Sequence, residues 1–433
     1  MKIHILGIAG TKTAPLAILL QRMGHQVSGS DQPQIFPPIS TLLAKNKIPI
    51  NSTPITKEID QVIVGNSFKS FQLCQSEYQQ AQKLKIPTMS YTQYLIRNLI
   101  KKQSILVAGS YGKTTITGLL SFVFLKLKLD PSYMFGGQAV NHLESTRFGQ
   151  SDFSIIEACE SINGLDTQST FLYYPIKYVI LTSADWEHKD SFKTEQENLK
   201  AFIQLVSKIP KNGLLVYNPK SKSASSVAQY SSAKKVPYNY SLNINPIIPG
   251  KYNFENSLAV ATLCQELGLN KIAFIKAINQ FRGIKRRLEP IYHHKDILIY
   301  DDFAQSPVRI SQALQAISEK HPNCPIKVFF EPHASFLQYQ AGIKGLKESL
   351  QIATEIIVSP LKFSESVSKS DRVTIKDYQK ILEKKMEYIP DYQLISQHYL
   401  QTLQKGDILI HFSSGGLNGL TCLKKIAKNL ISR

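Results

Sequence analysis

Apolar residues along this chain fall into short runs that alternate with stretches of helical spacing. Residues 2–9 form the first run, Gly10 follows, and apolar positions then recur at helical spacing from Leu16 to Met23, before a second run around Val27. This order predicts a strand, a helix and a strand parallel to the first, the opening of an α/β domain. Further strands are predicted at 61–65, 104–108, 153–157, 177–182, 297–300, 326–330, 354–358 and 407–412.

Three longer segments have the pattern of helices. These helices are predicted at about 116–127, at 253–267 and at 271–281. The pattern breaks after the last of them, and a strand then opens a new α/β section. We therefore predict three α/β domains, over residues 1–102, 103–283 and 284–433.

Composition is compatible with several buried cores. The chain has 433 residues, of which 43% are hydrophobic. Its five cysteines are scattered and lack CxxC spacing, so neither a disulfide framework nor a zinc cluster is indicated. No apolar stretch approaches the roughly 18 residues of a spanning helix, and the N-terminus runs directly into a strand. We expect a cytoplasmic protein without a membrane partner.

The formal charge of +19 is compatible with nucleic acid, an anionic membrane surface or phosphorylated substrates as partners. The lysines are spread along the chain and form no basic block interleaved with aromatic residues. A solvated lysine-rich surface, with no nucleic-acid partner, is therefore the favoured interpretation.

A glycine-rich motif follows the strand predicted at 104–108. It reads Gly109, Ser110, Tyr111, Gly112, Lys113, Thr114, Thr115 and leads into a long apolar helix. Backbone N–H groups at such a junction can bind phosphate oxygens. Lys113 supplies a charge for the β- and γ-phosphates, and Thr114 a hydroxyl for Mg²⁺. The full Walker spacing would place glycine at 107, where this chain has valine. We predict a central P-loop ATPase domain that binds ATP and Mg²⁺.

The motif without its first glycine resembles the ATP loop of the Mur ligases and their folate-adding relatives. Five further segments match the family in order: Glu157 to Glu160, Thr182 to Asp190, Asn253 to Asn256, Arg286 to Glu289 and Asp301 to Pro307. The resemblance spans nearly the entire chain. It implies a Rossmann-like N-terminal domain that binds a UDP-sugar, the central ATP-binding domain and a Rossmann-like C-terminal domain that binds the acceptor.

The resemblance also implies a catalytic and metal-binding set. Glu157 would join Thr114 as a ligand of Mg²⁺, His188 would ligate a second cation, and Lys113 would contact the phosphates. Glu157 comes at the carboxyl end of a predicted strand, where α/β sheets bind ligands. A histidine shortly after a strand can ligate a cation through a neutral imidazole nitrogen. Each residue alone would be an ordinary surface side chain.

Three further residues are implied to bind ATP. Asn256 would contact adenine, whereas Arg287 and Asp302 would reach the phosphates and the ribose after the third domain closes. Taken singly, Asn256 is as well explained as a helix-start residue. Arg287 and Asp302 are as well explained as partners in surface ion pairs.

The N-terminal glycine turn resembles the UDP-binding site of the family members that take UDP-N-acetylmuramate. The residues concerned are Gly7, Gly10, Ser30, Asp31 and Asn66. The run from Phe36 to Thr41 is similar to one in the murein peptide ligases, the branch that attaches a cell-wall tripeptide. A glycine turn alone is also compatible with a generic nucleotide fold.

The function implied is ATP-dependent formation of an amide bond. The lactyl carboxylate would take the γ-phosphoryl group, and the amine of the tripeptide would attack the acyl phosphate. Three alternatives stay open: L-alanine as acceptor, a relative that binds without ligating, and a basic NTPase acting on nucleic acid. The non-ligating alternative rests on departures from the family pattern at Tyr111, Cys159, Tyr252, Gln305 and Ser306.

Overall fold

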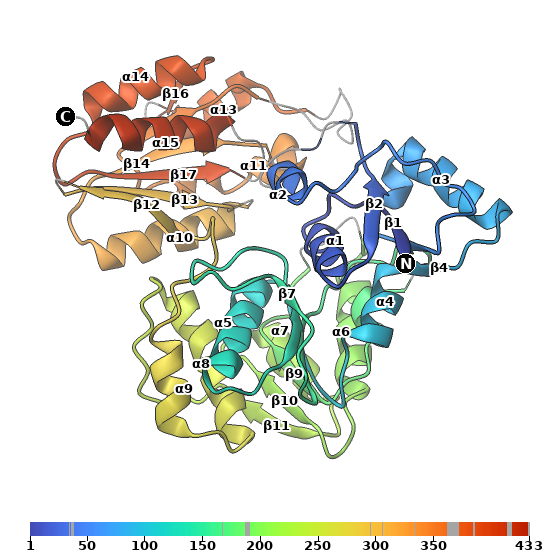
Figure 1. The fold of residues 1–433 in the computed structure, drawn as a ribbon. Helices are drawn as coiled ribbons and strands as arrows, with labels where there is room; N and C mark the ends of the chain where they lie inside the picture. The colour runs from blue at the N-terminus through green and yellow to red at the C-terminus, as the bar shows by residue number, and fades with distance from the viewer. Residues whose placement is uncertain are drawn as a thin grey trace. The chain divides into compact units, whose positions relative to one another are not determined.

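The computed structural model describes the chain except for residues 34, 36–38, 167, 187–190, 295, 305, 334, 362–371, 384–385, 414–417 and 432–433. The described strands form three separate sheets, and helices pack against each of them (Figure 1). The α/β architecture predicted from the sequence is confirmed. Two compact units are distinguished, residues 1–248 with 253–284, and residues 249–252 with 285–433.

The first sheet is entirely parallel and has the order β2-β1-β3-β4. Its strands are β1 (Lys2–Leu6), β2 (Gln26–Ser30), β3 (Gln61–Val64) and β4 (Thr88–Ser90). The helices of this segment are α1 (Thr13–Arg22), α2 (Ile39–Lys45), η1 (Phe68–Ser70), α3 (Gln72–Lys83) and α4 (Tyr91–Asn98). Helix α4 begins at Ser90, whose hydroxyl accepts from the Gln93 N–H while the Gln93 side chain accepts from the Ser90 N–H. Because all four strands are parallel, their carboxyl ends meet at one edge of the sheet.

The second sheet contains seven strands in the order β11-β10-β9-β5-β8-β6-β7, with only β7 antiparallel among the described pairings. Its strands are β5 (Gln103–Ala108), β6 (Ser132–Met134), β7 (Thr146–Arg147), β8 (Phe153–Glu157), β9 (Tyr178–Leu181), β10 (Leu214–Tyr217) and β11 (Lys234–Pro237). The helices are α5 (Lys113–Lys126), η2 (Thr170–Leu172), α6 (Glu195–Ser207), α7 (Lys222–Ala228), α8 (Lys251–Glu266) and α9 (Lys271–Ile278). Helix α5 is buried continuously from Thr114 to Phe124, which fixes the phosphate loop that precedes it.

The third sheet has the order β12-β13-β17-β14-β15-β16, with β12 antiparallel to β13. Its strands are β12 (Glu289–His294), β13 (Ile297–Asp302), β14 (Ile326–Glu331), β15 (Glu355–Val358), β16 (Met386–Tyr388) and β17 (Ile408–Ser413). The helices are α10 (Pro307–Lys320), η3 (Ser335–Gln338), α11 (Gln340–Ile343), α12 (Leu346–Ser349), α13 (Ile375–Leu382), α14 (Tyr392–Thr402) and α15 (Asn418–Ile431).

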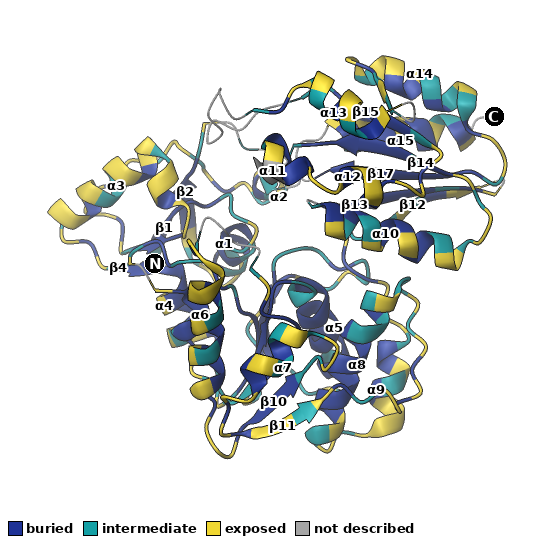
Figure 2. Ribbon diagram, turned by 180° about the vertical axis from the view of Figure 1, so that it is seen from behind, coloured by how far each residue is buried: buried dark blue, intermediate teal, exposed yellow. Residues whose placement is uncertain are grey.

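Burial follows the pattern expected for sheets covered by helices. In Figure 2 the central strands are buried and the exposed residues gather on the outer faces of the helices. Strands such as β5 and β17 are apolar and almost continuously buried, as is usual for parallel strands covered on both faces. Within the described part of the chain, no helix is both long and apolar enough to span a bilayer.

Candidate active site

The phosphate-binding loop, residues 109–112, joins β5 to α5 and depends on two glycines. Gly109 has a φ of +126° and Gly112 a φ of +77°, backbone conformations that side chains strongly disfavour. A Cβ at Gly109 would overlap Thr182 Oγ1, and a Cβ at Gly112 would lie 2.5 Å from Asn256 Oδ1. The loop is therefore packed closely against its neighbours, and Asn256, predicted to contact adenine, lies directly beside it.

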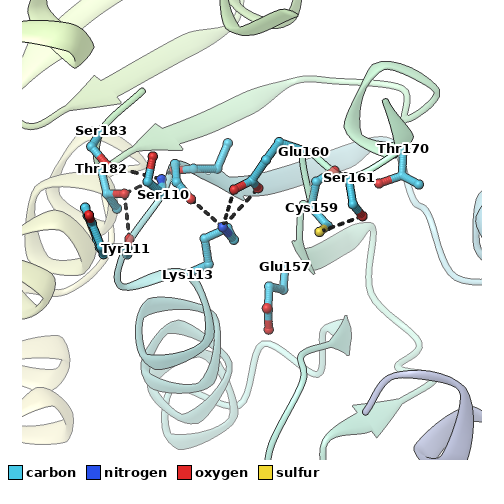
Figure 3. A network of polar contacts seen from close by, with 12 residues as sticks. Ser110, Tyr111, Lys113, Glu157, Cys159, Glu160, Ser161, Thr170, Thr182 and Ser183 are labelled. Carbon is cyan, nitrogen blue, oxygen red and sulfur yellow. Dashed lines mark hydrogen bonds and ion pairs between the residues drawn. The ribbon is translucent and has the colours of Figure 1, made fainter. Parts of the chain in front are cut away.

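The residues that follow β9 hold the loop in place (Figure 3). The Thr182 hydroxyl donates to the Tyr111 carbonyl at 2.6 Å, and the Ser110 N–H donates to Ser183 Oγ at 3.1 Å. The Ser110 hydroxyl in turn donates to the Asp185 carbonyl at 2.6 Å. These contacts fix the loop through the protein's own groups, which is the preorganisation that electrostatic catalysis requires.

Lys113 opens α5, and its ammonium is already paired. It donates to the Gly109 carbonyl at 2.5 Å and lies 3.0 and 2.9 Å from the two carboxylate oxygens of Glu160 (Figure 3). The side chains are only 11% and 2% exposed, so the pair is largely shielded from water. Phosphate groups that bind Lys113 must compete with Glu160. Lys113 was predicted to bind phosphate, whereas no role was predicted for Glu160, the last residue of the matched segment Glu157 to Glu160.

Glu157 and Thr114 border the same short turn. The Gly136 N–H donates to Glu157 Oε2 at 2.7 Å, and a Cβ at the neighbouring Gly137 would lie 3.3 Å from Thr114 Cγ2. A carboxylate and a hydroxyl are oxygen donors of the kind that Mg²⁺ prefers, and Mg²⁺ usually completes its shell with water and substrate phosphates. Both side chains are thus of the type that the predicted metal site needs, and their role as ligands stays a prediction. The described residues contain no cluster of three or more His, Cys, Asp or Glu that could hold a metal alone.

The residues predicted to bind the UDP-sugar lie at the carboxyl edge of the first sheet. Gly7 and Gly10 belong to the turn between β1 and α1, and Asn66 is exposed shortly after β3. The Ala9 N–H donates to Asp31 Oδ2 at 2.7 Å, so Asp31 holds the glycine turn. Ser30 is fully buried, and its Oγ lies 3.4 Å from Cys74 Sγ. The structure thus brings these predicted residues to one edge and turns the Ser30 side chain inward.

Arg287 and Asp302 lie in the second compact unit. Asp302 is buried at the end of β13 and accepts from the Leu288 N–H at 2.7 Å. Burial raises the pKa of Asp302 to about 6, against the opposing effects of this hydrogen bond and of the Arg287 charge. The two predicted residues are thus electrostatic neighbours.

Some residues named in the sequence analysis lie outside the described part of the chain. They are the proposed metal ligand His188, the departure at Gln305, and Phe36, Pro37 and Pro38 of the N-terminal run. Their roles stay predictions.

Two models of known protein families match this sequence. The "Mur ligase family, catalytic domain" matches residues 2–102, and the "Mur ligase middle domain" matches residues 107–246, which together make up more than half of the chain. The chain belongs to the Mur ligase family. Mur ligases are ATP-dependent enzymes that form amide bonds, typically with Mg²⁺, and this chain is an enzyme of that kind.

Individual relatives extend the similarity over nearly the entire chain. The UDP-N-acetylmuramate–L-alanine ligase of Desulfitobacterium hafniense is 26% identical, covering 96% of this chain and 98% of the relative. A ligase of Escherichia coli is 27% identical, and the match covers 97% of this chain and 96% of the relative. Its name gives the substrates as UDP-N-acetylmuramate and L-alanyl-γ-D-glutamyl-meso-2,6-diaminoheptandioate. The crystal structure of UDP-N-acetylmuramate–alanine ligase from Thermotoga maritima superposes with a TM-score of 0.79 at 22% identity, covering 100% of this chain and 99% of that one.

Proposed function

We propose that this Mur ligase joins L-alanine to the lactyl carboxylate of UDP-N-acetylmuramate. The observation that carries the proposal is the overlap, over 83% or more of this chain, with seven relatives of that name. This acceptor differs from the tripeptide expected from the Phe36 to Thr41 run. The structure describes only part of that run, which resembles one branch over six residues. The L-alanine ligases match this chain over 400 residues or more.

Membership of the Mur ligase family implies the chemistry, and the residues around the phosphate loop are compatible with it. A carboxylate oxygen of the sugar attacks the γ-phosphorus of ATP, the bond to the β-phosphate oxygen breaks, and ADP leaves. The amine then attacks the acyl carbon, and inorganic phosphate leaves. Lys113 stabilises the transferring phosphoryl group once the phosphates displace Glu160 from its ammonium. Mg²⁺ held by Thr114 and Glu157 would neutralise phosphate charge.

The tripeptide is the second candidate acceptor. The Escherichia coli relative named for that peptide is 27% identical over nearly all of both chains, about as similar as the L-alanine ligases. Both candidates share the nucleotide sugar and the acyl phosphate, so only the attacking amine distinguishes them.

Competition between the two amines tests the proposal. Purified enzyme receives ATP, Mg²⁺ and UDP-N-acetylmuramate with equimolar L-alanine and tripeptide, and mass spectrometry identifies the adducts. We expect UDP-N-acetylmuramyl-L-alanine to dominate, with no adduct from the Lys113→Ala control. Dominance of the tripeptide adduct would assign the second candidate, and no adduct with either amine would contradict both.

A further inference from the structure

A second lysine lies beside the catalytic carboxylate, and neither the phosphate loop nor the metal site makes use of it. Lys12 precedes α1, in the turn that carries the predicted UDP-binding glycines. Its ammonium donates to the Glu157 carbonyl at 3.2 Å and lies 3.9 Å from Glu157 Oε1. A residue of the first sheet's glycine turn thus reaches the carboxyl end of β8 in the second sheet, within the same compact unit.

A second observation, at Gly136, also brings the turn between β1 and α1 close to Glu157. A Cβ at Gly136 would lie 3.4 Å from Thr11 Oγ1 and 3.6 Å from Glu157 Oε2. Thr11 and Lys12 therefore both lie at the turn that carries Glu157's hydrogen-bond donor. A substrate held by the N-terminal glycine turn would extend towards these residues on its way to the γ-phosphate.

The two active-site lysines have different partners. Lys113 is bound by both oxygens of Glu160, whereas the described contacts of Lys12 are one carbonyl and one distant carboxylate oxygen. An ammonium carries three donors, so Lys12 retains hydrogen-bonding capacity for a ligand. The ordinary pKa of a lysine ammonium lies far above neutral pH. Lys12 is therefore a cation at neutral pH.

The side chain of Tyr91 is buried within electrostatic range of Glu157. Tyr91 is 6% exposed, and its hydroxyl has no hydrogen-bond partner among the described residues. It interacts electrostatically with Tyr174, Glu157 and Cys159, and Tyr174 interacts in turn with Lys12. Orphaned buried hydroxyls are costly and usually indicate a bound water or ligand.

We propose that Lys12 binds the lactyl carboxylate of the nucleotide sugar and holds it beside Glu157 for attack on the γ-phosphate. This inference rests on the proposed function, because it takes the sugar as substrate. The ammonium would offset the repulsion between an incoming carboxylate and Glu157, which like charges at short range would otherwise impose. It would also orient the attacking oxygen.

A binding comparison with two nucleotide sugars tests this role without turnover. UDP-N-acetylglucosamine lacks the lactyl carboxylate but keeps the UDP group of UDP-N-acetylmuramate. Both are titrated by calorimetry into wild type, Lys12→Met and Lys12→Arg, with a non-hydrolysable ATP analogue and Mg²⁺ present throughout. Lys2→Met is the matched control, because it removes an ammonium from an exposed ion pair with Glu58 in the same sheet.

Lys12→Met should weaken binding of UDP-N-acetylmuramate by roughly 10-fold or more, the usual effect of losing a charge-assisted hydrogen bond. Its affinity for UDP-N-acetylglucosamine should stay within about 2-fold of wild type, and Lys12→Arg and Lys2→Met should keep most of the affinity for both sugars. Equal weakening for both sugars would mean that Lys12 binds the shared diphosphate or only stabilises the contact between the two sheets, and it would overturn the inference. Unchanged binding of both by Lys12→Met would overturn it as well. Failure of the wild type to bind either sugar would instead contradict the proposed function.

Discussion

Lys113 is predicted to bind the phosphates of ATP, and it also forms a buried ion pair with Glu160, so one substitution at this position affects both activity and stability. Lys113→Ala should abolish ATP-dependent phosphate release, because it removes the charge on the transferring phosphoryl group. It should also lower the free energy of unfolding by about 3 kcal/mol, because the buried ion pair between Lys113 and Glu160 would lose one partner. Phosphate release and urea denaturation, measured on the same preparation, separate the two effects.

The double variant Lys113→Ala/Glu160→Gln is the control for stability. It also neutralises the carboxylate at position 160 and should recover much of the lost free energy of unfolding without recovering phosphate release. Full activity in Lys113→Ala would remove Lys113 from the catalytic set. Glu160→Gln alone should bind ATP more tightly, because the phosphates would no longer compete with a carboxylate for the lysine.

Glu157 is predicted to hold Mg²⁺ together with Thr114. Glu157→Gln should raise the Mg²⁺ concentration needed for half-maximal phosphate release by about tenfold or more, because an amide is a much weaker ligand for a hard cation. Glu144→Gln is the matched control. Glu144 is an exposed carboxylate that precedes β7 and pairs with Arg22. An unchanged Mg²⁺ titration for Glu157→Gln would place the metal elsewhere.

At the level of elements, alanine substitutions at Gly112, which precedes α5, and at Gly268, which follows α8, should differ in their effect on ATP affinity. Gly112→Ala should cost about 1 kcal/mol in backbone strain and also weaken ATP binding, because the new Cβ would displace Asn256. Gly268→Ala, after α8, has a similar φ of +69° but nothing within 4 Å of a new Cβ. It should therefore show the backbone cost alone, with unchanged ATP affinity by calorimetry. Equal ATP affinities in the two variants would contradict the close packing of the loop.

A buried histidine joins three strands of the third sheet. His411 of β17 lies 2.7 Å from Asp301 Oδ1 of β13 and 2.9 Å from Glu331 Oε2 of β14. Burial opposes its charge, but the hydrogen bonds to Asp301 and Glu331 outweigh burial and raise the pKa of His411 to about 9. A raised histidine pKa stabilises the fold fully below about 6.5 and loses that contribution as the pH rises through about 9.

Hydrogen exchange should therefore detect an alkaline weakening of this sheet. Amide protection factors along β17 should fall between pH 6.5 and pH 9.5 in the wild type. His411→Gln does not titrate in that range, so its protection should be lower at pH 6.5 and should change less. A wild-type protection factor that stays constant across this range would show that His411 is not charged in the folded state.

The elements also show how far pattern alone could predict the fold. The apolar strands at the sheet centres, such as β5 and β17, were predicted to within about two residues because they are buried on both faces. No strand was predicted at seven positions where the structure has one, namely β4, β6, β7, β10, β11, β12 and β16. Six of these have only two to four residues, and β12 is largely exposed at the sheet edge. Such strands are defined by a neighbour that lies elsewhere in the sequence. Helix α5 begins at Lys113 and not near 116, because Gly112 ends the loop there.

At the scale of the whole molecule, the sequence named residues but not their partners. The motif identified Lys113 and Thr114, and the resemblance added Glu157 and Asn256. Neither indicated that Glu160 neutralises Lys113, or that Lys12 reaches Glu157 from a turn 145 positions earlier in the chain. Those pairings depend on how separate sheets pack, which local spacing does not encode. The roles assigned to the site residues stay predictions.

The central claim is that this enzyme activates a sugar carboxylate as an acyl phosphate, and isotope transfer tests it most directly. UDP-N-acetylmuramate labelled with ¹⁸O in the lactyl carboxylate is incubated with ATP, Mg²⁺ and L-alanine, and the released phosphate is analysed by mass spectrometry. Because the attacking carboxylate oxygen stays on phosphorus when the amine displaces phosphate, the account predicts one ¹⁸O atom in each phosphate derived from fully labelled sugar. Release of unlabelled phosphate alongside amide formation would contradict it.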